Sequence, residues 1–227
     1  MLALPFISDI SHVKLSIVDF SNWKTKTPEA SIRQIVQVND EFFRIKPGLW
    51  ALEKYRNEVL RKFYLDPNDR HSDDLFTHSY YQGIVVELGN IKQHGTYVPA
   101  QDKNKKFLEK NLHELTTMKE IPCFTYDKLV KRARTVDVIW FNERMMPCGF
   151  YEIEHTTDIK NSLSKFYELQ DFRAKFYIIA DKSRNEQFND IMSMSLYSPI
   201  KEYVKFFSYK DLIRQYEKEK IVLDREL

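Results

Sequence analysis

The fold of this protein is decided by residues 135–156, which read TVDVIWFNERMMPCGFYEIEHT. Two segments rich in β-branched and aromatic residues, 135–141 and 150–156, are separated by the stretch from Asn142 to Gly149. Runs of this length and composition are typical of β-strands, and the stretch between them has room for a connecting loop. The sequence therefore predicts a β-hairpin whose two strands both contain acidic residues.

The elements on either side of this hairpin predict an α/β fold. The pattern indicates a helix over 76–92 and a strand over 95–99 before it, and a helix over 160–172 and a strand over 175–180 after it. The last of these strands is almost continuously apolar, as expected of a central strand that is buried on both faces. We expect a central mixed sheet flanked by helices. The remaining expected elements are a polar insertion at 100–133, a helix from Ser183, a strand at 204–208 and a charged helix at 209–220.

The N-terminal part predicts a second, smaller unit. In Lys26-Thr27-Pro28-Glu29-Ala30, Thr27 suits the N-cap of a helix and Pro28 suits its first position. The segment FFRIKPGLWAL at 42–52 then predicts two short strands joined by a turn. A polar, turn-rich stretch follows and reads as a connection. We expect an N-terminal segment at 1–58, a linker at 59–75 and a larger domain at 76–227.

Acidic side chains of the hairpin are expected to gather on one face. Glu152 and Glu154 are two residues apart in a strand, so their side chains point to the same side. Asp137 falls close to that face if the two strands pair. Burying carboxylates side by side is costly unless a cation lies between them. Glu87 falls in the apolar stripe of the helix expected over 76–92, and it too needs a partner, either a metal or a lysine.

Oxygen ligands of this kind favour Mg²⁺ or Mn²⁺ over Zn²⁺. A Mg²⁺ ion held by few carboxylates keeps water molecules, and it can bind a phosphodiester and activate a water as nucleophile. Each acid also has a structural alternative. Asp137 could cap a turn or pair with Arg134, Glu152 could pair with a lysine, and Glu154 could be a solvated strand residue.

The order of these features resembles the PD-(D/E)XK nuclease superfamily, the restriction-endonuclease-like fold. Asp137 is followed after 14 residues by Glu152-Ile153-Glu154, and a helix that carries Glu87 precedes them. The resemblance covers about residues 75–210. It implies that Asp137 and Glu152 bind the metal, that Glu87 is an accessory ligand, and that Asp137, Glu152 and Glu154 form the catalytic set.

Glu154 departs from this family pattern, because most members carry a catalytic lysine at that place. Some type II restriction endonucleases carry glutamate there and still cleave, whereas other members place the lysine elsewhere. Candidates for a displaced lysine in this chain are Lys160, Lys165 and Lys175. An inactive site is the remaining alternative.

A second resemblance concerns the N-terminal segment. WKTKTPEASI at 23–32, followed by the hairpin at 42–52, is similar to the second half of a winged helix-turn-helix of the HARE-HTH type, a family found fused to restriction endonucleases and chromatin proteins. The resemblance covers about residues 10–55 and implies DNA contact by the helix and by the hairpin. Alternatively, this segment only packs against the larger domain. The candidate DNA-binding residues are Ser31, Arg33, Gln34, Gln37, Arg44 and Lys46.

Composition excludes several other classes of protein. The chain has 227 residues, 43% of them hydrophobic, and a formal net charge of +2, so it can build a core and its charge neither demands nor excludes nucleic acid. Two cysteines are too few for a disulfide scaffold or a four-thiolate metal site. Motifs of ATP-binding loops, dinucleotide sites, serine hydrolases and zinc proteases are absent. No run is long enough to span a membrane, and we expect a cytoplasmic protein.

These features together predict a Mg²⁺-dependent endonuclease of double-stranded DNA, with Mn²⁺ as a substitute. Nine basic and five acidic residues at 101–134 lead directly to Asp137, and they could follow DNA phosphates or form a solvated loop. Double-strand cleavage needs two sites, so a homodimer is expected at least on DNA. The alternatives are a non-catalytic DNA-binding protein with a degenerate nuclease fold, and a modification-dependent or RNA-directed nuclease.

Overall fold

The structure, a computed structural model, describes most of the chain from the first N-terminal helix onward. The described residues are 7–9, 28–46, 49–56, 59–60, 70–108, 110–156 and 158–226.

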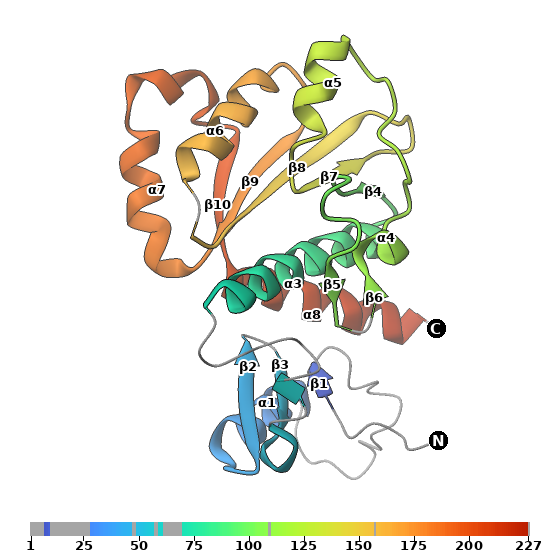
Figure 1. Cartoon of the computed structure of the whole chain (residues 1–227), viewed down its shortest axis with the longest axis vertical. Helices are drawn as coiled ribbons and strands as arrows, with labels where there is room; N and C mark the ends of the chain where they lie inside the picture. Colours follow the sequence, from blue (N-terminus) through green and yellow to red (C-terminus); the bar gives the residue numbers. More distant parts are fainter. Residues whose placement is uncertain are drawn as a thin grey trace.

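A five-stranded sheet forms the centre of the larger domain (Figure 1). Its strand order is β10-β9-β8-β7-β4. β4, β7 and β8 pair antiparallel, whereas β8, β9 and β10 pair parallel, so the sheet is mixed. The predicted α/β class with a central mixed sheet is therefore confirmed. The strands are β4 (Gly95–Tyr97), β7 (Val138–Phe141), β8 (Pro147–Glu154), β9 (Lys175–Ala180) and β10 (Val204–Ser208).

Helices cover both faces of this sheet, as Figure 1 shows. On one face lie α3 (Arg70–Ile91) and α8 (Tyr209–Glu226), and on the other lie α5 (Asp127–Ala133), α6 (Ile159–Glu168) and α7 (Asn185–Met192). Within the described ranges, none of these helices has both the length and the apolar character needed to cross a bilayer.

The strands contribute side chains to two hydrophobic cores, one on each face of the sheet, because successive side chains of a strand point to opposite faces. Trp140 and Tyr151 join the core beneath α3 and α8, whereas Ile139 and Phe150 join the core beneath α6 and α7. α3 is buried around most of its middle: Tyr80, Tyr81, Ile84, Val85, Val86 and Leu88 are all 2% exposed or less. A helix buried on this many sides is apolar around its circumference rather than along one stripe.

Several boundaries differ from the predicted ones. α3 begins at Arg70, inside the segment expected as a linker. A helix tolerates polar residues in its first turns, so composition alone did not separate the linker from the helix. β7 begins at Val138 rather than at 135, and the polar insertion contains β5 (Lys106–Phe107), β6 (Lys110–Asn111) and α4 (Leu112–Leu115) besides α5. The division into domains stays a prediction.

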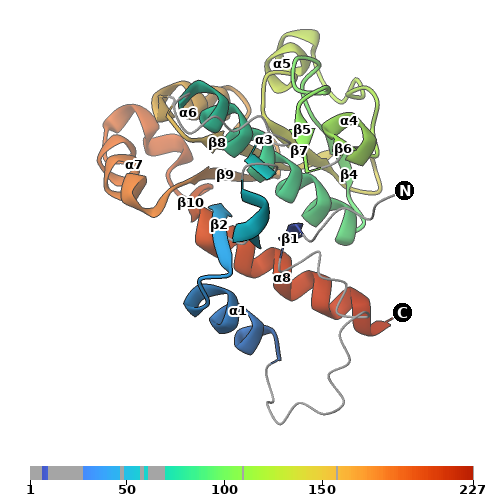
Figure 2. The same ribbon diagram turned by 60° about the horizontal axis from the view of Figure 1, so that its bottom comes forward.

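The N-terminal residues form a small three-stranded sheet beside one helix (Figure 2). Its strands, in the order β1-β3-β2, are β1 (Ile7–Asp9), β3 (Leu49–Leu52) and β2 (Phe42–Lys46), and the helix is α1 (Pro28–Val38). The helix and the hairpin match the predicted elements, whereas β1 was not predicted. Phe43 and Ala51 belong to the same buried cluster as α3 and α8, so this unit packs on the larger domain.

The insertion before β7 is anchored to α3 through one glycine. A Cβ atom added to Gly83 would lie 2.2 Å from a ring carbon of Phe107, so any side chain there would collide with that ring. Phe107 is 2% exposed and stacks on Tyr80 with ring centroids 5.7 Å apart. This contact holds β5 against the helix that also lines the acidic site described next. The short 3₁₀ helices η2 (Glu53–Tyr55), η3 (Lys182–Arg184) and η4 (Ser195–Ile200) complete the described elements.

Candidate active site

Two glutamates of β8 share one serine of α6. Glu152 is 2% and Glu154 is 3% exposed, which excludes the solvated alternative for Glu154. The Ser162 hydroxyl lies 2.8 Å from Glu152 Oε2 and also contacts Glu154 Oε1. One hydroxyl carries a single proton and can donate to only one carboxylate at a time. The second contact is satisfied when the other glutamate is protonated and donates to the serine oxygen.

Lys165 supplies the positive charge of this cluster. Its Nζ lies 2.8 Å from both oxygens of Glu152, and it also donates to the carbonyl of Thr135 at 2.8 Å. The Lys165 side chain is only 12% exposed. It comes from α6, one turn after Ser162, so the helix delivers both groups to the same strand. Of the three candidate lysines, Lys165 is the one that contacts Glu152, so the alternative in which a lysine pairs with this glutamate describes the observed contact.

Asp137 lies just before β7 and faces the end of β8. Its Oδ2 accepts the backbone N–H of Ile153 at 2.7 Å and lies 3.2 Å from Nε2 of His78 on α3. This side-chain oxygen takes the acceptor role that a backbone carbonyl would have if β7 extended further. That is the physical reason why the strand starts one residue after Asp137 and not at 135.

A layer of buried polar groups supports Asp137 from α3 and from the insertion. Gln82 is fully buried, and its Nε2 donates to the Asp137 carbonyl at 2.7 Å and to Asp102 Oδ2 at 3.0 Å. Asp102 is 2% exposed and forms an ion pair with Lys105 at 2.6 Å. The main chain at Asp137 is thus fixed by Gln82, while its side chain is fixed by His78 and Ile153.

Glu152 and Asp137 have opposite pKa shifts. Burial raises the pKa of Glu152 well above its usual range, and the negative charge of Asp137 adds to this effect, although Lys165 and Ser162 oppose it. Burial also acts to raise the pKa of Asp137, but the hydrogen bond and charge of His78, the Ile153 N–H and the charge of Lys165 outweigh it. The pKa of Asp137 is therefore lowered. The cluster favours a proton on Glu152 and a charge on Asp137.

We expect the metal-free protein to lose stability as the pH rises above about 4.3, the usual pKa of a glutamate. A raised pKa in the folded state means that folded Glu152 keeps a proton that the unfolded chain has released. The stabilisation that Glu152 contributes is complete below its pKa in the unfolded chain, and it is lost as the pH rises through its pKa in the folded protein. Asp137 acts in the opposite window, because its contribution is lost only as the pH falls through its lowered pKa, below about 3.9.

Urea unfolding in chelator between pH 5 and pH 8 measures this loss, and each unit of pKa difference is worth about 1.4 kcal/mol. In Glu152→Gln the loss should largely disappear, because glutamine cannot ionise. Glu186→Gln, an exposed position on α7, is the matched control and should behave like the wild type. The same pH dependence in Glu152→Gln and wild type would show that Glu152 is not its source.

The structure does not bring three of the predicted site residues to this cluster. The Glu87 carboxylate contacts the hydroxyl of Tyr216 and lies 3.7 Å from Lys220 Nζ, both on α8. Glu87 has partners, as predicted, and they are a tyrosine, which was not expected, and a lysine, which was one of the expected alternatives. Lys160 is exposed at the start of α6. Lys175 begins β9 opposite Gly149, away from the strand end that carries Glu154.

The candidate DNA-binding residues lie on the N-terminal helix and hairpin. Gln34, Gln37 and Arg44 are exposed, and Ser31 is half-buried. The side chains of Arg33 and Lys46 lie outside the described residues. DNA contact by these residues stays a prediction.

Three polar residues of the site were not among the residues predicted for it from the sequence. His78 and Gln82 are four residues apart on α3 and therefore share a helix face, which was a usable signal. Ser162 gave no signal, because a serine in a helix is common and its two partners lie 8 and 10 residues earlier on another element.

One comparison with known proteins gives a match that covers most of the larger domain. The family model described as type II restriction enzyme NmeDI C-terminal domain matches residues 65–224. No curated protein and no solved structure matches the chain. The matched range contains the whole acidic cluster, the five-stranded sheet and the helices on both of its faces, except for the last two residues of α8. Because the match spans more than half of its residues, the chain belongs to the family of the type II restriction enzyme NmeDI C-terminal domain.

Proposed function

We propose that this protein is a Mg²⁺-dependent endonuclease that hydrolyses phosphodiester bonds of double-stranded DNA. Membership of a restriction enzyme family supports DNA as the substrate. The observation that carries the proposal is the meeting of Asp137, Glu152 and Lys165, from three separate segments of the chain, at one end of β8. Two carboxylates and one lysine are the catalytic groups that the resemblance to the PD-(D/E)XK superfamily implies.

The available side chains fit a metal that needs few protein ligands. Among the residues that the structure describes, no group of three acidic, histidine or cysteine side chains forms a ready cation site. Mg²⁺ is nevertheless bound in many enzymes by one or two carboxylates, with water and substrate phosphate completing its shell. Asp137 and Glu152 would hold it here. When bound, such an ion polarises the phosphodiester and lowers the pKa of a coordinated water.

The remaining residues of the cluster have separate roles in this proposal. Lys165 donates to Glu152 in the free protein and stabilises negative charge on the phosphate during hydrolysis. It takes the place of the lysine that most PD-(D/E)XK members carry where this chain has Glu154. Glu154 is hydrogen-bonded to Ser162 and buried, so it shapes the site and does not act as a free base. Glu87, Lys160 and Lys175 are left out of the proposed site.

DNA would be held by the N-terminal helix and hairpin and by the basic insertion. Gln34, Gln37 and Arg44 are exposed there and can reach bases or phosphates. Lys119, Lys128 and Lys131 are exposed along the segment that leads to Asp137. A homodimer on DNA would provide the two sites needed to cut both strands.

The proposal predicts that cleavage depends strictly on a divalent metal. We expect discrete fragments from unmethylated phage DNA with Mg²⁺ or Mn²⁺, none with chelator, and recovery when Mg²⁺ is restored. The assay is repeated on methylated DNA. A gel shift in Ca²⁺ measures binding separately.

Binding without cleavage on every substrate and with every metal would favour the alternative, a DNA-binding protein with an inactive nuclease fold. Cleavage that continues in chelator would contradict the metal role. Cleavage of methylated DNA alone would keep the nuclease chemistry and change only the substrate.

A further inference from the structure

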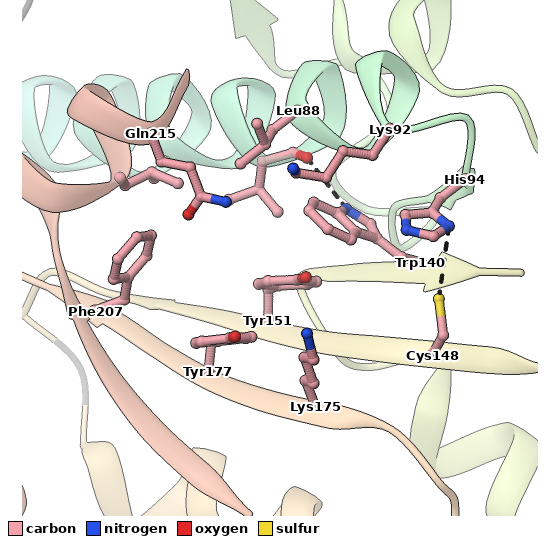
Figure 3. Close-up of a pocket in the computed structure, with 12 residues that line it drawn as sticks. Leu88, Lys92, His94, Trp140, Cys148, Tyr151, Lys175, Tyr177, Phe207 and Gln215 are labelled. Atoms are coloured by element: carbon pink, nitrogen blue, oxygen red, sulfur yellow. Dashed lines mark hydrogen bonds between the residues drawn. The ribbon is translucent and has the colours of Figure 1, made fainter. Parts of the chain in front are cut away.

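A pocket lies on the face of the sheet opposite the acidic cluster (Figure 3). It has a volume of about 320 Å³ and is enclosed by α3, α8 and the strands β7, β8, β9 and β10. This volume is at the lower end of the range for small-molecule sites. Tyr151 and Tyr177 line it, whereas Glu152, the residue after Tyr151, points to α6 on the other face. The pocket is therefore separate from the proposed catalytic site.

Aromatic rings form most of the floor of this pocket. Tyr151 and Tyr177 are stacked, with ring centroids 5.2 Å apart and an interplanar angle of 6°. Trp140 lies 4.5 Å from Tyr151, and Phe207 lies 6.0 Å from Tyr177. Figure 3 shows the two tyrosine rings edge-on below α3 and α8. Aromatic rings that line a pocket can stack against a nucleobase, with little dependence on which base is present.

Positive charge gathers at one end of the pocket. Lys92, His94 and Lys175 all line it, and Figure 3 shows the Lys175 ammonium beside Tyr177 and Cys148. Lys92 is paired with Glu219 at 2.5 Å. Lys175 makes no ion pair or hydrogen bond with any residue that the structure describes. Burial and the charges of these two lysines lower the pKa of His94, so the positive charge of this end comes from the lysines and not from the imidazole.

Several uncharged polar groups of the pocket also lack partners. The hydroxyls of Tyr151 and Tyr177 and the amide of Gln215 make no side-chain hydrogen bond within the described part of the chain. Tyr151 is only 7% exposed, so its hydroxyl has little access to bulk water except through the pocket. Hydroxyl and amide groups can donate to and accept from the edge of a heterocyclic base. The pocket thus offers aromatic faces, base-edge partners and an unpaired ammonium together.

We propose that this pocket binds a nucleobase together with its adjacent phosphate. The base would lie against Tyr151 and Tyr177, and the phosphate would face Lys175 with Lys92 behind it. Two sources carry this chemistry, a free mononucleotide or an unpaired base of a DNA strand. The inference does not depend on the proposed nuclease activity, because it uses none of the residues of the acidic cluster.

Isothermal titration calorimetry of the full chain tests the proposal with three probes: 5′-AMP, inorganic phosphate and a short single-stranded oligonucleotide. We expect saturable binding of AMP in the micromolar to low millimolar range and much weaker binding of phosphate alone.

Lys175→Ala should weaken AMP binding about tenfold, because one charge-assisted contact is lost. Tyr177→Leu should weaken it about tenfold through lost stacking. Lys201→Ala, an exposed lysine between η4 and β10, is the control and should change nothing.

The probes also distinguish the two sources. Binding of AMP that Lys175→Ala weakens shows a free nucleotide site. Oligonucleotide binding that Lys175→Ala weakens, without AMP binding, shows a site for a base of the DNA. Equal binding of phosphate and AMP would overturn the proposal, as would binding of neither AMP nor oligonucleotide, or binding that Lys175→Ala leaves unchanged. Lys175 is exposed, so this variant is not expected to impair folding.

Discussion

Asp137→Asn is expected to reduce the rate of DNA cleavage at least about 10³-fold while the protein stays folded and still binds DNA. Asparagine has nearly the same shape and can still accept the Ile153 N–H through its amide oxygen. It loses the negative charge that would hold Mg²⁺. Transition-state stabilisation by such an ion is worth several kcal/mol, and about 4 kcal/mol corresponds to this loss of rate.

The measurement is single-turnover cleavage at saturating Mg²⁺, beside a gel shift in Ca²⁺ and a thermal melt. Asp190→Asn changes an exposed aspartate on α7 and should cleave like the wild type. Wild-type cleavage by Asp137→Asn would remove this residue from the metal site. Loss of cleavage together with a lowered melting temperature would point to misfolding, and Glu152→Gln, which removes the other proposed ligand, would then be the deciding variant.

Much of the central fold was accessible from the sequence because it rests on strong local patterns. The run at 175–180 was predicted with its observed bounds, since a continuous apolar segment of this length fits a buried central strand. The hairpin before Glu154 was also predicted, and β7 and β8 pair as expected. The start of β7 was not, because the side chain of Asp137 replaces a backbone acceptor. The spacing of residues in a sequence does not show where a side chain replaces a backbone acceptor.

The candidate site was predictable only in its acidic half. Alternation placed Glu152 and Glu154 on one face, and both do contact Ser162. Periodicity also showed that Glu87 needed a partner. It could not show that the partners are Tyr216 and Lys220, which lie about 130 residues further along the chain and meet α3 only through the packing of α8. The choice among three lysines depended on tertiary structure for the same reason.

Lys165→Met is expected to slow cleavage about 10²- to 10³-fold, the usual cost of removing one preorganised group that stabilises charge in a transition state. Lys165 is the residue that replaces the missing lysine in this proposal, and its Nζ is 2.8 Å from both oxygens of Glu152. Methionine keeps the length of the side chain without its charge. Lys160→Met, five residues earlier on the same helix and exposed, is the matched control and should cleave at the wild-type rate.

A purely structural role of Lys165 would give a different result, because the lysine also donates hydrogen bonds to the buried Glu152 side chain. Removing one partner of a buried ion pair can cost about 3–5 kcal/mol of stability, although protonation of Glu152 reduces this cost. Lys165→Arg separates the two roles. It restores the charge and should recover melting temperature, but its planar, wider head group is not equivalent to an ammonium at this position and should leave cleavage impaired. Two results would contradict the catalytic role: full recovery of cleavage in Lys165→Arg, or wild-type rates in Lys165→Met once the protein is folded with Mg²⁺. Either result would show that Lys165 is only a structural partner of Glu152 and that another residue supplies the catalytic positive charge.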